Sequence, residues 1–88
     1  MRNESAQSAA QTVRGYLLEN IDIPDLKSDV DIFAEGYVNS LFAIELMTFL
    51  EKTFQIKVVM EDLDMENFKS IDTICAFIEK KKEGGAHA

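Results

Sequence analysis

Residues 40–54 are expected to form a helix, because they contain neither glycine nor proline and include many strong helix formers, such as leucine, glutamate and methionine. At about 100° per residue, their apolar side chains gather mainly on one broad face. The residues of this face are Phe42, Ala43, Leu46, Met47, Phe49, Leu50 and Phe54. A helix with such a face must bury it against other elements, so the segment predicts a core helix.

Two further segments have helical patterns. Residues 5–20 repeat apolar side chains at helical spacing and are weakened slightly by Gly15. Ser70 suits the N-cap of a last helix. The three lysines at 80–82 suit its C-terminus, and Gly84 and Gly85 are expected to end it. With a short helical turn within residues 61–67, the predicted fold is all-α, a small bundle of three main helices plus one short helix.

The connection at residues 21–39 is longer than compact domains usually tolerate. It contains the only proline, Pro24, and Gly36 marks a turn before the helix at 40–54. Such a connection must be held to the core by its apolar side chains. These are Ile21, Ile23, Leu26, Val30, Ile32 and Phe33.

The length of 88 residues fits one domain over residues 1–88, with residues 5–82 ordered and 83–88 a flexible tail. Nine basic against 16 acidic residues give a net charge of −7, which disfavours nucleic acid and anionic membranes and suits basic patches on partner proteins. Neither a signal segment nor a membrane-spanning run is expected, so we predict a cytoplasmic monomer. The only cysteine, Cys75, excludes an internal disulfide and is expected to be a small core residue.

Two aliphatic residues, Leu41 and Ile44, fall on the opposite, polar face of the helix at 40–54. The other residues of that face are Glu45, Thr48, Glu51 and Lys52. Aliphatic side chains in this position indicate a contact surface for another protein. The alternative is that the long preceding connection folds over them.

Ser40 stands at the start of this helix, where unpaired backbone N–H groups and the positive end of the helix dipole favour a phosphate ester. Helix starts are also accessible to a modifying enzyme. The alternative is that Ser40 is an ordinary helix cap. A catalytic serine would need a general base, and the only histidine, His87, lies in the expected tail. We therefore predict no catalytic residue.

Three acidic residues, Asp62, Asp64 and Glu66, alternate as metal ligands can. A calcium loop that began at Asp62 would need glycine at its sixth position and glutamate at its twelfth. This chain has Asn67 and Thr73 there. We therefore predict no metal site and interpret the segment as a solvated acidic loop.

A series of short motifs runs from about Val13 to Ile78. They are Asp31-Ile32-Phe33, Gly36, Asn39-Ser40-Leu41, Ile44-Glu45-Leu46, Leu50-Glu51-Lys52-Thr53-Phe54, Ile56 and Asn67-Phe68-Lys69-Ser70-Ile71. In this order they resemble the acyl carrier protein family. The resemblance implies that Ser40 receives 4′-phosphopantetheine covalently from a phosphopantetheinyl transferase, and that the thiol of this arm carries acyl groups as thioesters. It also implies that partner enzymes recognise Asn39, Leu41, Ile44, Glu45, Thr48 and Glu51.

One position departs from the family, because Asn39 replaces the usual aspartate; it keeps a helix cap but removes a negative charge. The stretch at 36–43 resembles discrete carriers for unusual polyketide extender units of the hydroxymalonyl, methoxymalonyl or aminomalonyl type. This implies polyketide or hybrid polyketide/nonribosomal peptide biosynthesis, as for antibiotics, with an acyl-loading enzyme, dehydrogenases and an acyltransferase or ketosynthase as partners. The alternatives are an amino-acid carrier of the peptidyl or D-alanyl type, and an unmodified interaction module with the carrier fold.

Overall fold

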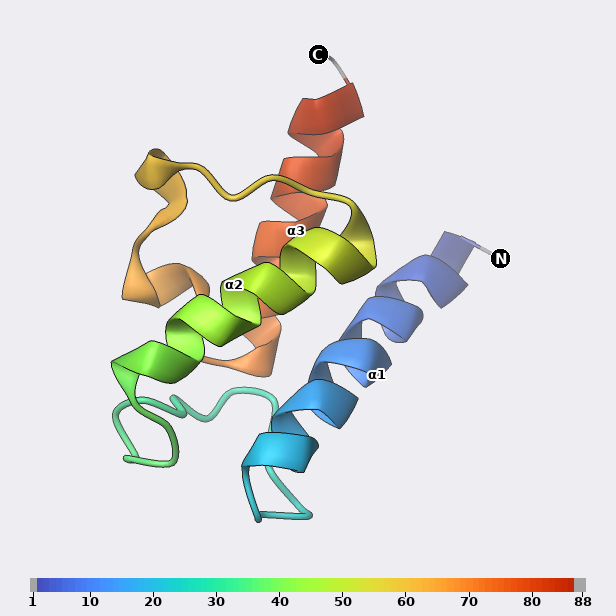
Figure 1. The fold of residues 1–88 in the computed structure, drawn as a ribbon. Helices are drawn as coiled ribbons and strands as arrows, with labels where there is room; N and C mark the ends of the chain where they lie inside the picture. The colour runs from blue at the N-terminus through green and yellow to red at the C-terminus, as the bar shows by residue number, and fades with distance from the viewer. Residues whose placement is uncertain (1, 87–88) are drawn as a thin grey trace.

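The computed structural model describes residues 2–86, and the side chains of residues 9–83 within them. Three α-helices make up most of the fold: α1 (Arg2–Asn20), α2 (Ser40–Phe54) and α3 (Ile71–Ala86). Two single 3₁₀ turns, η1 (Met60–Asp62) and η2 (Met65–Asn67), lie between α2 and α3. Figure 1 shows α2 crossing in front of α3 with α1 next to them, and η2 contacts α3. The described part of the chain contains no strand, so the predicted all-α fold is confirmed.

The core lies where the apolar faces of the three helices meet. On α2, the buried residues Phe42, Ala43, Leu46 and Leu50 belong to the face that helical periodicity selects. Tyr16 of α1 stacks on Phe49 of α2 with 4.0 Å between ring centroids. The buried residues that α1 and α3 contribute are Val13, Leu17, Ile71, Ile74, Phe77 and Ile78. The helices are therefore held together chiefly by apolar burial.

The connection at residues 21–39 has no regular secondary structure, yet it is fixed to the core. Ile21, Leu26 and Ile32 are buried, as their positions predict. The N–H of Ile32 donates to the carbonyl of Lys69 at 2.8 Å, which ties the connection to the segment before α3. Gly36 has φ of +78°, a conformation that favours glycine, and it turns the chain toward α2. The connection thereby fixes where α2 begins.

Three details differ from the prediction. Helix α1 begins at Arg2, earlier than residue 5. The short helical turn expected within residues 61–67 is present as η2, but a second turn, η1, precedes it and begins at Met60. The prediction that Gly84 and Gly85 end the last helix is wrong, because α3 continues to Ala86. Glycine weakens a helix interior by about 1 kcal/mol but does not forbid helical dihedrals. His87, expected in a tail, lies outside the described residues. Within residues 2–86, no helix is both long and apolar enough to span a bilayer.

Candidate functional site at the start of α2

Helix α2 begins at Ser40, and the residue that caps it is Asn39. Asn39 has extended backbone dihedrals, and its side-chain Oδ1 accepts a hydrogen bond from the Phe42 N–H at 3.1 Å. This is the geometry of an N-cap, and the same N–H also donates to the backbone carbonyl of Asn39 at 3.0 Å. Ser40 is the first helical residue, so the interpretation of Ser40 as the cap is wrong. Its side chain is left available for another role.

The surroundings of Ser40 fit a phosphate ester. The residue is exposed, and its hydroxyl has no hydrogen-bond partner among the described residues. The first turn of α2 contains no acidic residue that would repel a phosphate. The N-terminal end of a helix of this length carries a partial positive charge that stabilises an anion. A phosphorylated arm on Ser40 would therefore meet a favourable field and no steric barrier from this chain.

Leu41 and Ile44 project into solvent beside Ser40, with 65% and 60% of their surfaces exposed. The long connection at residues 21–39 does not cover them, which removes the alternative in which it folds over this face. Glu45 and Thr48 are exposed on the same side of α2. The geometry places these four residues together with Ser40, while their recognition by partner enzymes remains a prediction.

Glu51 occupies a different position from the one that the helical wheel suggests. It is half-buried, and its Oε2 accepts a hydrogen bond from the N–H of Val58 at 2.8 Å. This bond fixes the extended stretch that follows α2. Helical periodicity could not predict this hydrogen bond, because Val58 is seven residues from Glu51 and lies beyond the end of the helix. Glu51 therefore has a structural role in addition to the predicted surface role.

Two acidic residues of the η1–η2 segment, Asp62 and Asp64, accept hydrogen bonds from within the chain. Asp62 is only 7% exposed, and its Oδ2 accepts hydrogen bonds from Lys81 Nζ at 2.7 Å and from the Val59 N–H at 3.0 Å. Asp64 caps η2 through a bond from the Glu66 N–H. Among the described residues, no three histidine, cysteine or acidic side chains are close enough to hold a metal. The prediction of a solvated acidic loop is wrong for Asp62, because Lys81 compensates its burial.

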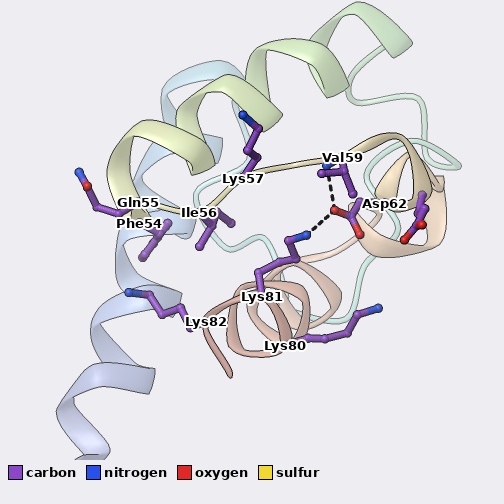
Figure 2. Close-up of a pocket in the computed structure, with 10 residues that line it drawn as sticks. Phe54, Gln55, Ile56, Lys57, Val59, Asp62, Lys80, Lys81 and Lys82 are labelled. Carbon is purple, nitrogen blue, oxygen red and sulfur yellow. Dashed lines mark hydrogen bonds and ion pairs between the residues drawn. The ribbon is translucent and has the colours of Figure 1, made fainter. Parts of the chain in front are cut away.

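Lys81 was predicted only as a cation at a helix end. Figure 2 shows its side chain crossing from α3 to Asp62, which lies in η1. Periodicity cannot reveal such a pair, since it joins residues 19 positions apart. The only sequence signal is the accumulation of three lysines on a helix that lies after an acidic segment.

Cys75 is half-buried in α3 and packs against the core. The sequence predicted a small core residue at this position, and the structure differs only in that Cys75 is not fully buried. Burial raises the pKa of its thiol, and the carboxylates of Asp72 and Glu79 raise it further. The thiolate is the nucleophilic form of cysteine, so this environment disfavours reaction at Cys75. A reactive thiol at Ser40 would therefore have to belong to a group attached there.

The comparisons with known proteins agree with this geometry. Residues 11–78 match the family described as "Phosphopantetheine attachment site". The chain is 34% identical over 55 residues to a protein named "D-alanyl carrier protein" from Lactococcus lactis subsp. lactis (strain IL1403), covering 62% of this chain and 70% of that protein. A protein of the same name from Streptococcus uberis (strain ATCC BAA-854 / 0140J) is 36% identical over 53 residues, covering 60% of this chain and 66% of the relative.

Proposed function

The chain belongs to the phosphopantetheine-attachment family of carrier proteins, and we propose that Ser40 bears the arm and that the cargo is an amino acid. Carrier proteins of this family hold 4′-phosphopantetheine covalently and are not themselves catalysts. The arm supplies a terminal thiol that holds the cargo as a thioester. This chain's own contribution is to present the arm and to be recognised by the enzymes that modify and load it.

The exposed position of Ser40 at the start of α2 is the observation that carries the assignment. Asn39 takes over the capping of the helix, so Ser40 can be esterified without loss of a cap. Leu41 and Ile44 give a transferase an apolar surface about one helical turn or less from the reacting hydroxyl. In this transfer the Ser40 oxygen displaces adenosine 3′,5′-bisphosphate from the pyrophosphate of coenzyme A, forms a phosphate ester with the arm and loses its proton.

The names of the relatives favour an amino-acid cargo. Both are named for D-alanine, which supports the amino-acid alternative and not the extender-unit role implied by the short motif at 36–43. Dehydrogenases and a ketosynthase are accordingly not proposed as partners. The proposed partners are a phosphopantetheinyl transferase and an enzyme that activates D-alanine and transfers it to the thiol of the arm.

The attachment is tested by intact-mass measurement of the full chain after incubation with coenzyme A and a broad-specificity phosphopantetheinyl transferase. We expect a gain of one phosphopantetheine, located at Ser40 by fragmentation. The variant Ser40→Ala should stay unmodified while its circular dichroism remains that of a folded helical protein. A folded wild-type chain that gains no mass would contradict the proposal and favour an unmodified interaction module.

The cargo is tested separately on the modified chain. It is incubated with ATP, a D-alanine-activating enzyme from a bacterium related to those above, and either D-alanine or L-alanine. We expect a further mass gain with D-alanine that hydroxylamine removes, as it removes thioesters. Modification at Ser40 without any loading by D-alanine would leave the carrier assignment intact and overturn the cargo.

A further inference from the structure

A groove lies at the end of α2 that is remote from Ser40. It is formed where the C-terminus of α2, the extended stretch after it, η1 and the last part of α3 meet (Figure 2). Its apolar lining comes from Phe54, Ile56 and Val59, of which the first two are half-buried. The function proposed above makes no use of this groove.

The groove is positively charged although the chain as a whole carries −7. Four of its lining residues are lysines: Lys57, Lys80, Lys81 and Lys82. The lining also includes Glu61 and Asp62, and Asp62 is neutralised by its pair with Lys81. The three other lysines are exposed and form no ion pair with a described residue. The lining residues outside this pair therefore carry three cations and one carboxylate, that of Glu61.

We propose that this groove docks an acidic peptide segment of a partner protein, anchored by an apolar side chain. Charge complementarity favours an acidic occupant, and the apolar lining of Phe54, Ile56 and Val59 suits an anchor beside the charges. A hollow surface accommodates a protruding segment better than the flat surface of a bilayer. The net charge of −7 also disfavours both an anionic membrane and a second copy of the chain.

The position of the groove separates its occupant from the arm. Ser40 and Phe54 are the first and last residues of α2, which puts them about 21 Å apart along the helix axis. A partner bound at the groove would leave Ser40, Leu41 and Ile44 accessible. The carrier could thus remain attached to one protein while its arm visits another, which raises the effective concentration of the cargo. This inference goes beyond the proposed function and does not depend on it.

The test uses a fluorescein-labelled synthetic peptide with three glutamates on each side of a central leucine–phenylalanine pair. Its binding to the full chain is measured by fluorescence anisotropy in low salt, and its location by amide chemical-shift changes. We expect shifts at residues 54–62 and 80–82. The variant Lys82→Glu should weaken binding by about fivefold or more, because it reverses a charge in the groove. A peptide with serines in place of the apolar pair should also bind more weakly.

Lys27→Glu is the matched control, since it changes the net charge equally at an exposed residue outside the groove. It should bind the peptide nearly as the wild type does, and Ser40→Ala should bind it unchanged. Equal losses in Lys27→Glu and Lys82→Glu would overturn the proposal in favour of non-specific attraction. Absence of shifts at the groove, or stronger binding to phosphatidylglycerol vesicles than to the peptide, would overturn it as well.

Discussion

Lys81 Nζ lies 2.7 Å from Asp62 Oδ2, and this pair joins α3 to η1. Both side chains are largely buried, with 20% of the lysine and 9% of the aspartate side-chain surface exposed. The backbone of Asp62 is engaged too, because its carbonyl accepts a hydrogen bond from Asn67 Nδ2 at 3.0 Å. Asp62 therefore links η1, η2 and α3, and it fixes the segment that forms one wall of the basic groove.

Replacing Lys81 with methionine should destabilise the fold measurably. Lys81→Met keeps the length of the side chain but leaves the buried Asp62 carboxylate without its cation. We expect a loss of about 1–3 kcal/mol in the free energy of unfolding, less than for a fully buried pair because Lys81 is partly exposed. Urea unfolding followed by circular dichroism measures it. The control Lys82→Met, at an exposed neighbouring residue, should change the free energy of unfolding by less than about 0.5 kcal/mol. Equal losses of stability in the two variants would contradict a structural role for the Lys81–Asp62 pair.

The Lys81–Asp62 pair should also make the free energy of unfolding depend on pH in the acidic range. Burial alone would raise the pKa of Asp62, but hydrogen bonds from Lys81 and the Val59 N–H outweigh it and lower that pKa. The folded pKa then lies below the unfolded one. The stabilisation from Asp62 is therefore fully present above about pH 4 and is lost as the pH falls through the folded pKa.

Unfolding of the wild type and of Asp62→Asn at several pH values tests this dependence. We expect the wild type to be more stable at pH 7 and the gap to narrow below about pH 4. Asp29→Asn, at an exposed position in the connection before α2, serves as the control. A gap between wild type and Asp62→Asn that stays constant over this range would show that ionisation of Asp62 contributes nothing.

The cap at Asn39 leads to a prediction about α2 itself. Asn39→Ala removes the side-chain acceptor of the Phe42 N–H but leaves the Asn39 carbonyl, which also accepts a bond from it. The loss should therefore be about 0.5–1 kcal/mol in thermal or urea unfolding, at the low end for a cap substitution. Asn39→Asp supplies an equivalent acceptor, so its stability should match that of the wild type. A destabilised aspartate variant would mean that the amide group, and not the acceptor oxygen alone, matters at this position.

The thiol of Cys75 should react slowly in the folded protein. Burial and the carboxylates of Asp72 and Glu79 raise its pKa, so a smaller fraction is thiolate at pH 8 than for an ordinary cysteine. We expect the rate of reaction with a thiol reagent such as dithiobisnitrobenzoate to be lower in buffer than in about 8 M urea, by about tenfold or more. Similar rates in both solutions would show that the folded structure does not protect Cys75.

The local pattern of residue types was sufficient to predict the features that depend on residues close together in the sequence. The bounds of α2 follow from an uninterrupted run of helix formers, and the prediction of residues 40–54 is confirmed by Ser40–Phe54. Ser70 was predicted as the cap of α3, and its Oγ accepts a hydrogen bond from the Thr73 N–H at 3.2 Å. The exposure of Leu41 and Ile44 was also predictable, because a helix of fixed pitch has only one face for the core.

Features that depend on tertiary contacts could not be predicted in this way. A helical wheel assigns every charged residue to solvent, so it misplaced Glu51 and gave no partner for Lys81. The wheel also cannot show that the chain after α2 returns over its last turn, which creates the groove. Asp62 was misread for the same reason, because an aspartate among other acidic residues gives no sign of the lysine that lies across from it.

The apolar pair beside Ser40 should matter for modification but not for stability. The double variant Leu41→Ser/Ile44→Ser removes two exposed side chains, so its free energy of unfolding should change by less than about 0.5 kcal/mol. If enzymes dock on this surface, kcat/KM for phosphopantetheine transfer to Ser40 should fall about tenfold. Leu46→Ala, on the buried face of α2, should show the reverse pattern, with a loss of about 2–5 kcal/mol in stability. Unchanged transfer to the double variant would mean that the transferase recognises another part of the chain, despite the exposure of Leu41 and Ile44.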